Sequence, residues 1–179
     1  MNTYISGNAI EGARFRVGGT TTTAFSKRLF LDGYLAYGSK DRKLKYDGIV
    51  EYSFIDKKDY RKEFPVHSIR FEYLYDINQL GQQYMYTNKD NMFLALKRQK
   101  DTRATYLRNM ELTYYRGHYN GWAYGAVLRN FKEYSTGYAA FDRIGPDGQI
   151  TATDSYRMSE VEFKFRFARM RNSTRLVIT

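Results

Sequence analysis

The chain has 179 residues and a formal net charge of +10, with 42% hydrophobic and 17% aromatic residues. This length predicts one domain, and so many aromatic side chains exclude a disordered chain. Cysteine is absent, which excludes a disulfide scaffold, a thiolate metal site and a cysteine nucleophile. No apolar run approaches the roughly 18–20 residues of a membrane-spanning helix. No apolar segment of a secretory signal is visible near the N-terminus.

Side-chain character alternates with a period of two along most of the chain, which predicts β-strands because successive side chains of a strand point to opposite faces. In chain order we expect strands at about 13–17, 29–38, 45–54, 68–77, 91–100, 105–116, 121–133 and 160–168. The clearest case is the last one, in which apolar and charged residues alternate throughout. These strands are close to the 9–11 residues that a tilted strand needs to cross a bilayer.

The connections predict an antiparallel meander. Polar and glycine-rich turns separate the strands, and both prolines lie between strands, as sheet hydrogen bonding requires. The longest connection, 134–155, can form a short hairpin around Pro146-Asp147-Gly148. The expected fold is all-β, an antiparallel up-and-down meander of about eight strands that forms a membrane β-barrel or part of a larger one. It fills a single domain, 1–179, with an irregular tail at 170–179.

Such a sheet could form a barrel in water or in a membrane. The apolar face would point inward in the first case and outward in the second. In a membrane barrel the apolar face meets lipid and the polar face lines the lumen. The abundance of tyrosine at strand ends favours the membrane, because tyrosine needs one wet end and a membrane interface supplies it. The side chains expected to face lipid are Tyr46, Tyr52, Phe54, Phe71, Tyr73, Phe163, Phe165 and Phe167. Those expected to face the lumen are Arg14, Arg16, Lys45, Glu51, Arg70, Glu72, Glu162, Lys164 and Arg166.

Two other classes of protein remain open. A soluble up-and-down barrel would reverse the faces and enclose an apolar ligand with the aromatic side. A basic nucleic-acid-binding β protein is a weaker alternative, because its aromatic and charged residues would have to share a face, and here they alternate. Salt-sensitive oligonucleotide binding would support it.

No motif indicates catalysis, so we do not expect an enzyme, a cofactor or a metal. The two histidines, His67 and His118, lack companions at metal-ligand spacing. The segment 18–23 is glycine- and threonine-rich, but it lacks the Gly-Lys-Ser/Thr ending of a phosphate loop. Glu160 and Glu162 share a strand face with basic neighbours, which indicates a cross-strand charge ladder rather than an acid–base pair.

One region resembles a known family. The segments 11–20, 25–34 and 36–41, together with Lys45-Tyr46 and Tyr106-Leu107-Arg108, are similar to the barrel region of large Bacteroidetes outer-membrane proteins classed as a domain of unknown function. Those proteins usually carry an N-terminal carboxypeptidase-regulatory-like domain. The resemblance covers most of residues 8–168.

The resemblance implies a location and a set of partners. It places the chain in the outer membrane of a Gram-negative bacterium, in contact with membrane lipid and with the rest of a larger barrel or parent chain. The chain shows neither a signal peptide nor a terminal aromatic strand, so we expect an internal fragment of the barrel. No nucleic acid and no metal are expected as partners, and the implied role is structural or transport-related.

Overall fold

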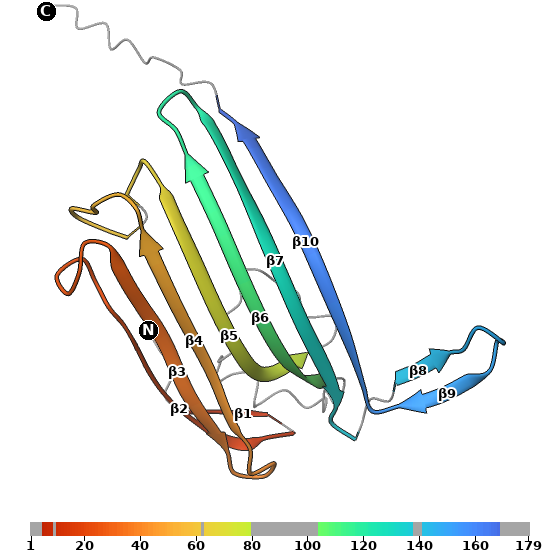
Figure 1. The fold of residues 1–179 in the computed structure, drawn as a ribbon. Helices are drawn as coiled ribbons and strands as arrows, with labels where there is room; N and C mark the ends of the chain where they lie inside the picture. The colour runs from red at the N-terminus through yellow and green to blue at the C-terminus, as the bar shows by residue number, and fades with distance from the viewer. Residues whose placement is uncertain (1–4, 9, 62, 80–103, 138–140, 169–179) are drawn as a thin grey trace, which may run out of the picture.

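The computed structural model describes residues 5–8, 10–61, 63–79, 104–137 and 141–168 (Figure 1). These residues form β-strands joined by turns and loops. The strands are β1 (Ile5–Asn8), β2 (Gly12–Thr20), β3 (Leu29–Gly38), β4 (Leu44–Ser53), β5 (His67–Gln79), β6 (Ala104–Gly117), β7 (Trp122–Ser135), β8 (Phe141–Ile144), β9 (Ile150–Thr153) and β10 (Ser155–Phe167). Within these ranges, no helix is long and apolar enough to cross a membrane.

Eight strands make one antiparallel sheet in the order β1-β2-β3-β4-β5-β6-β7-β10. Each strand pairs with its neighbour in sequence, except that β8 and β9 form a separate hairpin inserted between β7 and β10 (Figure 1). The predicted all-β antiparallel meander is therefore confirmed. The sheet is open and is not closed into a barrel, and no strand among the described residues pairs with the outer edge of β10.

Within the described residues, the strand predictions differ from the structure most clearly at β1 and at the start of the last strand. The short strand β1 was not expected. The strand expected at 91–100 and the tail expected at 170–179 both lie outside the described residues. The last strand begins at Ser155, earlier than expected, because its ladder with β7 continues from Phe167↔Trp122 down to Ser155↔Tyr134. The hairpin expected around 146–148 is confirmed as β8 and β9.

The ladders place residues of like character opposite one another, so the two faces of the sheet differ sharply. A row of apolar residues crosses six strands without interruption. Its members are Leu31, Val50, Phe71, Leu112, Leu128 and Val161. On the opposite face, a row of charged residues crosses four strands. Its members are Glu72, Glu111, Arg129 and Glu160.

Burial is inverted relative to an ordinary globular domain. The apolar face carries large exposed side chains, among them Phe163 and Phe165, which are 69% and 77% exposed. Several charged residues are buried instead, including Lys45 at 0%. Buried apolar residues pack together in one small cluster of Ile10, Ile77, Ala104 and Tyr106 at one end of the sheet. The large side chains of the apolar face are therefore mostly left uncovered by the rest of the described chain.

The sheet curves toward its polar face. Arg14 lies on β2 and Asp76 on β5, three strands away. At the usual strand spacing these backbones would lie roughly 14 Å apart in a flat sheet. Their side chains nevertheless meet at 2.9 Å. The polar face is therefore concave where β2 approaches β5, and the apolar face is convex there.

The β6–β7 turn depends on glycine at position 121. Gly121 has a φ of +89°, and a Cβ there would lie 2.2 Å from the carbonyl oxygen of Ala168. Gly137 has the same φ, but no atom lies within 4 Å of the place that a Cβ would take. Substitutions at these two positions therefore separate the cost of a left-handed backbone from the cost of a steric overlap, because only position 121 has both.

We expect Gly121→Ala to lower stability more than Gly137→Ala. The left-handed backbone costs alanine about 1–2 kcal/mol at either position. Overlap adds about 1–3 kcal/mol at position 121 alone. The measurement is the denaturant midpoint for loss of β-sheet circular dichroism. Equal losses in the two variants would contradict the role assigned to the contact with Ala168.

Candidate functional site

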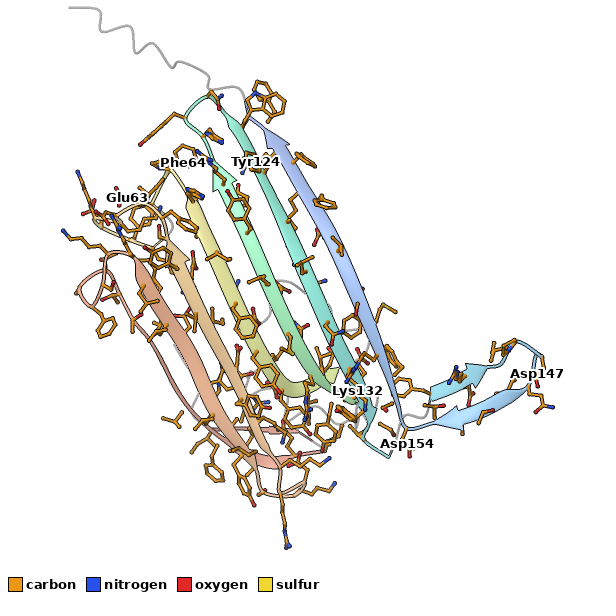
Figure 2. The ribbon with its side chains drawn as sticks, viewed as in Figure 1. Glu63, Phe64, Tyr124, Lys132, Asp147 and Asp154 are labelled. Carbon is orange, nitrogen blue, oxygen red and sulfur yellow. The ribbon has the colours of Figure 1, made fainter. Side chains whose placement is uncertain are left out.

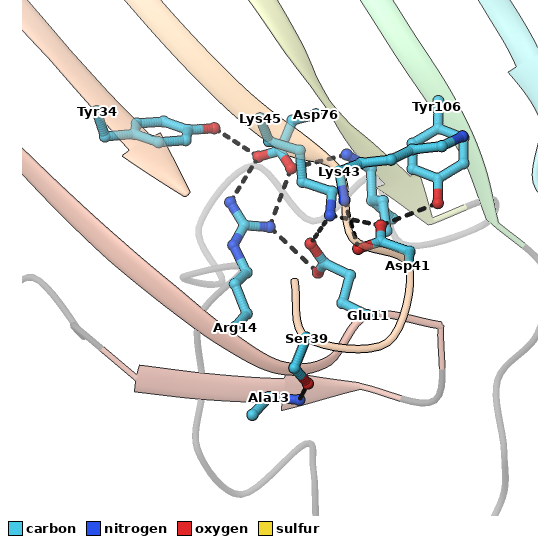
Figure 3. Close-up of polar contacts among 11 residues, drawn as sticks. Glu11, Ala13, Arg14, Tyr34, Ser39, Asp41, Lys43, Lys45, Asp76 and Tyr106 are labelled. Atoms are coloured by element: carbon cyan, nitrogen blue, oxygen red, sulfur yellow. Dashed lines mark hydrogen bonds and ion pairs between the residues drawn. The ribbon is translucent and has the colours of Figure 1, made fainter. Parts of the chain in front are cut away.

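A cluster of charged side chains, joined by hydrogen bonds and ion pairs, lies at the concave end of the sheet (Figure 3). We call it the basal ion network and define it as Glu11, Arg14, Asp41, Lys45 and Asp76. Its members come from the segment before β2, from β2, from the β3–β4 turn, from β4 and from β5. The curvature of the sheet is what brings these five segments together.

Each charge in the basal ion network has a partner of opposite sign. Arg14 donates two hydrogen bonds of 2.9 Å to the two oxygens of Asp76 and a weaker one to Glu11 at 3.4 Å. Lys45 Nζ lies 2.6 Å from Glu11 Oε1 and 2.5 Å from Asp41 Oδ2. Because Lys45 and Glu11 are both fully buried, this pairing is essential: a lone buried charge is strongly unfavourable.

Two tyrosines complete the network. The Tyr34 hydroxyl donates to Asp76 Oδ2, and the Tyr106 hydroxyl donates to Asp41 at 2.9 Å. The Arg16 guanidinium lies 3.7 Å from the centre of the Tyr34 ring. The network is therefore a set of charge-assisted hydrogen bonds that fills the concave end of the sheet.

A second polar group lies at the other end of the polar face. Arg61, from the β4–β5 loop, makes an ion pair with Asp32 and lies 2.5 Å from Glu51 Oε2. Its guanidinium also lies 5.7 Å from the ring of Phe30, which is completely buried. The β4–β5 loop thus folds over the polar face and covers that end.

Between these ends the polar face carries a cross-strand charge ladder. Arg129 lies 2.9 Å from both Glu111 and Glu160, so it joins β6, β7 and β10. Glu162 and Lys164 pair along the exposed strand β10 at 3.3 Å. The sequence predicted a charge ladder at Glu160 and Glu162, and the structure gives each of them a basic partner.

In the part of the chain that the structure describes, no group of three or more His, Asp or Glu residues could hold a metal ion. His67 lies 3.1 Å from the Tyr114 hydroxyl, and its ring packs against Phe54. Every cation of the basal ion network is engaged with carboxylates, so the network links the segments of the chain from which its members come.

The residues singled out from the sequence fall into two groups on opposite faces. Strand alternation and the registers place the expected lumen residues on the polar face, and they are Arg14, Arg16, Lys45, Glu51, Arg70, Glu72, Glu162, Lys164 and Arg166. The expected lipid residues all lie on the apolar face, and they are Tyr46, Tyr52, Phe54, Phe71, Tyr73, Phe163, Phe165 and Phe167. Of all these residues, only Arg14 and Lys45 belong to the basal ion network.

Sequence reasoning missed the acidic half of that network. Glu11 and Asp41 lie in connecting segments, and Asp76 lies near the end of β5. Alternation placed Asp76 on the polar face, but no local pattern joins it to a residue 62 positions away in the sequence. The curvature of the sheet creates the pair between Arg14 and Asp76, whereas Glu11 and Asp41 lie only three and four positions from their partners Arg14 and Lys45.

Comparisons with known proteins give no match: no protein-family model, no curated protein and no solved structure matches this chain.

Removing Asp76 should destabilise the fold strongly. Asp76→Ala takes away the bidentate partner of Arg14, and breaking a buried ion pair in this way costs about 3–5 kcal/mol. The matched control is Glu162→Ala, whose partner Lys164 is half exposed, and an exposed pair is worth only about 0–1 kcal/mol. The measurement is the free energy of unfolding of both variants. Similar values would contradict the importance assigned to the basal ion network.

Asp41 makes the network sensitive to acid. Burial alone would raise the pKa of Asp41, but hydrogen bonds from Lys45 and Tyr106 outweigh it and hold this pKa below its ordinary value. A carboxyl with a lowered folded-state pKa contributes stability above its unfolded pKa of about 4. That contribution is lost as the pH falls through the lower folded-state pKa.

We therefore expect Asp41→Asn to flatten the loss of stability on acidification below about pH 4. The measurement is the denaturant midpoint as a function of pH. Asp142→Asn, at an exposed position on β8, is the control and should keep the wild-type profile. An unchanged profile in the Asp41 variant would show that its ion pair does not contribute to acid sensitivity.

Proposed function

We propose that this chain is a lipid-embedded β-barrel segment of a bacterial outer-membrane protein, with a structural or transport-related role and no chemistry of its own. The observation that carries the proposal is the inverted burial of the sheet. Large apolar side chains are exposed on one face, while paired charges are buried on the other.

The size of the exposed apolar surface supports a lipid environment. Soluble monomers rarely expose contiguous apolar patches larger than a few hundred Å². Here an uninterrupted apolar row crosses β3, β4, β5, β6, β7 and β10. Further exposed side chains flank it, including Leu35, Phe163 and Phe165. In a bilayer, the acyl chains of the lipids would cover this apolar face.

Curvature supports the same orientation. The apolar face is convex where β2 approaches β5, so it would form the outside of a barrel. The concave face carries ion pairs, as the interior of a transmembrane barrel does. A soluble barrel with an aromatic interior requires the opposite curvature.

Aromatic residues stand at both ends of the apolar face, as the aromatic girdles of outer-membrane barrels do. At one end, Trp122 packs against Phe167 with ring centres 4.8 Å apart. At the other end, the rings of Tyr46 and Tyr75 lie 5.8 Å apart. Tyr124 and Lys132 mark these two ends on β7 (Figure 2). The longest strands, of 13 and 14 residues, exceed the 9–11 residues needed to cross a bilayer.

The open edge of β10 supports a place within a larger barrel. Its residues from Val161 to Ala168 are all exposed, and its outer backbone groups face no strand in the part of the chain described. In lipid such an edge must be paired, because unsatisfied backbone groups cost several kcal/mol each. Further strands of a parent chain, as the resemblance to the Bacteroidetes proteins implies, would supply that pairing.

Single cysteines placed on β10 test the proposal, since the natural chain has none. Phe163→Cys and Phe165→Cys place the thiol on the apolar face, and Glu162→Cys and Lys164→Cys place it on the polar face. Each variant is spin-labelled in lipid bilayers. We expect labels at 163 and 165 to be accessible to oxygen and shielded from a water-soluble nickel complex, with the reverse at 162 and 164.

Other outcomes point to other proteins. A compact monomer in plain buffer, with labels at 163 and 165 shielded from both reagents, would overturn the proposal in favour of a soluble barrel with an apolar interior. Accessibility that does not alternate with a period of two would show that the sheet does not lie at a lipid boundary.

A further inference from the structure

We propose that Arg108, Lys132 and Arg157, here called the basic row, bind the phosphate group of an anionic membrane lipid. This inference rests on the proposed function, because it requires the apolar face to lie against lipid. It adds a specific ligand chemistry at one place on that face.

The basic row is built by the register of three neighbouring strands. Arg108 on β6 lies opposite Lys132 on β7, and Lys132 lies opposite Arg157 on β10. Directly opposed residues on one face have Cβ atoms about 4.5–5.5 Å apart. Three positive charges therefore stand side by side on the apolar face, where Arg108 and Arg157 are exposed.

Within the described residues, no carboxylate neutralises the three positive charges of the basic row. Like charges directly opposite one another destabilise a sheet. On the polar face the cations Arg14, Arg70 and Arg129 each have a carboxylate partner. By contrast, none of the three basic-row residues forms an ion pair with any residue that the structure describes. A bound anion would remove this repulsion.

Tyrosine rings hold two of these cations, Arg108 and Lys132, in place without neutralising them. The Arg108 guanidinium lies 5.8 Å from the ring centres of both Tyr75 and Tyr134. Lys132 Nζ lies 4.7 Å from the ring centre of Tyr134. Such cation–π contacts attract the cation to the ring face but leave its charge and its donors available. The cations are thus positioned at the surface and not drawn into the polar interior.

The basic row lies at the edge of the apolar band, where a lipid headgroup would be. Moving along β6 and β7 from Arg108 and Lys132, the next residues on the same face are Met110 and Asn130, followed by Leu112 and Leu128. A phosphate at the basic row would therefore have its acyl chains over an apolar surface. Figure 2 shows Lys132 near the end of β7 from which the β8–β9 hairpin projects.

The donor set suits a phosphate. Each arginine can present two parallel N–H groups to phosphate oxygens, and lysine adds a compact charge with three donors. A phosphate monoester carries up to two negative charges, which three cations can match. A free phosphate ion would satisfy the same donors but would gain nothing from the apolar surface beside them, so we assign the site to a lipid.

Spin-labelled lipids test the assignment on the full chain reconstituted in phosphatidylcholine bilayers. The quantity measured is the association of spin-labelled phosphatidic acid with the protein relative to spin-labelled phosphatidylcholine. We expect a clear preference for phosphatidic acid in the wild type. The triple variant Arg108→Gln/Lys132→Gln/Arg157→Gln should lose this preference. The relative association of phosphatidic acid should fall about fivefold for each cation removed near the surface.

The matched control removes the same charge elsewhere. Lys27→Gln/Lys58→Gln/Arg143→Gln changes three exposed cations outside the main sheet and should keep the preference. If the triple variant does not insert, the single variant Arg157→Gln, on the exposed edge strand, should still show a partial loss. Excess inorganic phosphate should not abolish the preference.

The outcomes separate this inference from the proposed function. A wild-type chain that inserts and shows no preference for phosphatidic acid overturns the lipid site alone, as does an equal loss in the control variant. Complete displacement by inorganic phosphate would instead identify a site for a free anion. A chain that does not insert into bilayers at all overturns both proposals.

Discussion

The in-register backbone ladder is the constraint on which the rest of this structure depends. Most strands alternate mainly apolar with mainly polar side chains, and a slip of one residue would move a whole strand's side chains to the wrong face. Because seven successive pairings keep the alternation in phase, the two faces acquire largely opposite chemistry across the sheet. The proposed lipid-facing surface, the basal ion network and the basic row are all consequences of this register.

Charge pairing is the second requirement, and it explains why the polar face is tolerated in a buried position. Lys45 and Glu11 are fully buried, and burying either alone would be prohibitively unfavourable. The curvature that makes the polar face concave is what allows Arg14 to reach Asp76 across three strands. Curvature and pairing therefore support each other: the ion pair between Arg14 and Asp76 holds β2 near β5, and that curvature keeps both side chains buried.

The two faces handle positive charge in different ways. On the polar face the cations Arg129 and Arg61 bridge carboxylates on neighbouring elements, so their charge is neutralised within the chain. On the apolar face Arg108 and Lys132 meet tyrosine rings instead. Part of the net charge of +10 thus resides where no carboxylate of the described residues pairs with it, which links the composition of the chain to the proposed membrane boundary.

Local sequence pattern was enough to predict the all-β meander and the division of residues between faces, because a period of two is a property that each strand carries alone. Phe163 and Lys164 were assigned to opposite faces from alternation, and the ladder of β10 with β7 places them so. The three-dimensional arrangement supplied what local patterns do not encode. Curvature created the pair between Arg14 and Asp76, 62 residues apart, and the relative register of β6, β7 and β10 aligned three cations from separate strands. It also left the sheet open rather than closed, because closure depends on the pairing of its two edge strands and not on the pattern within any strand.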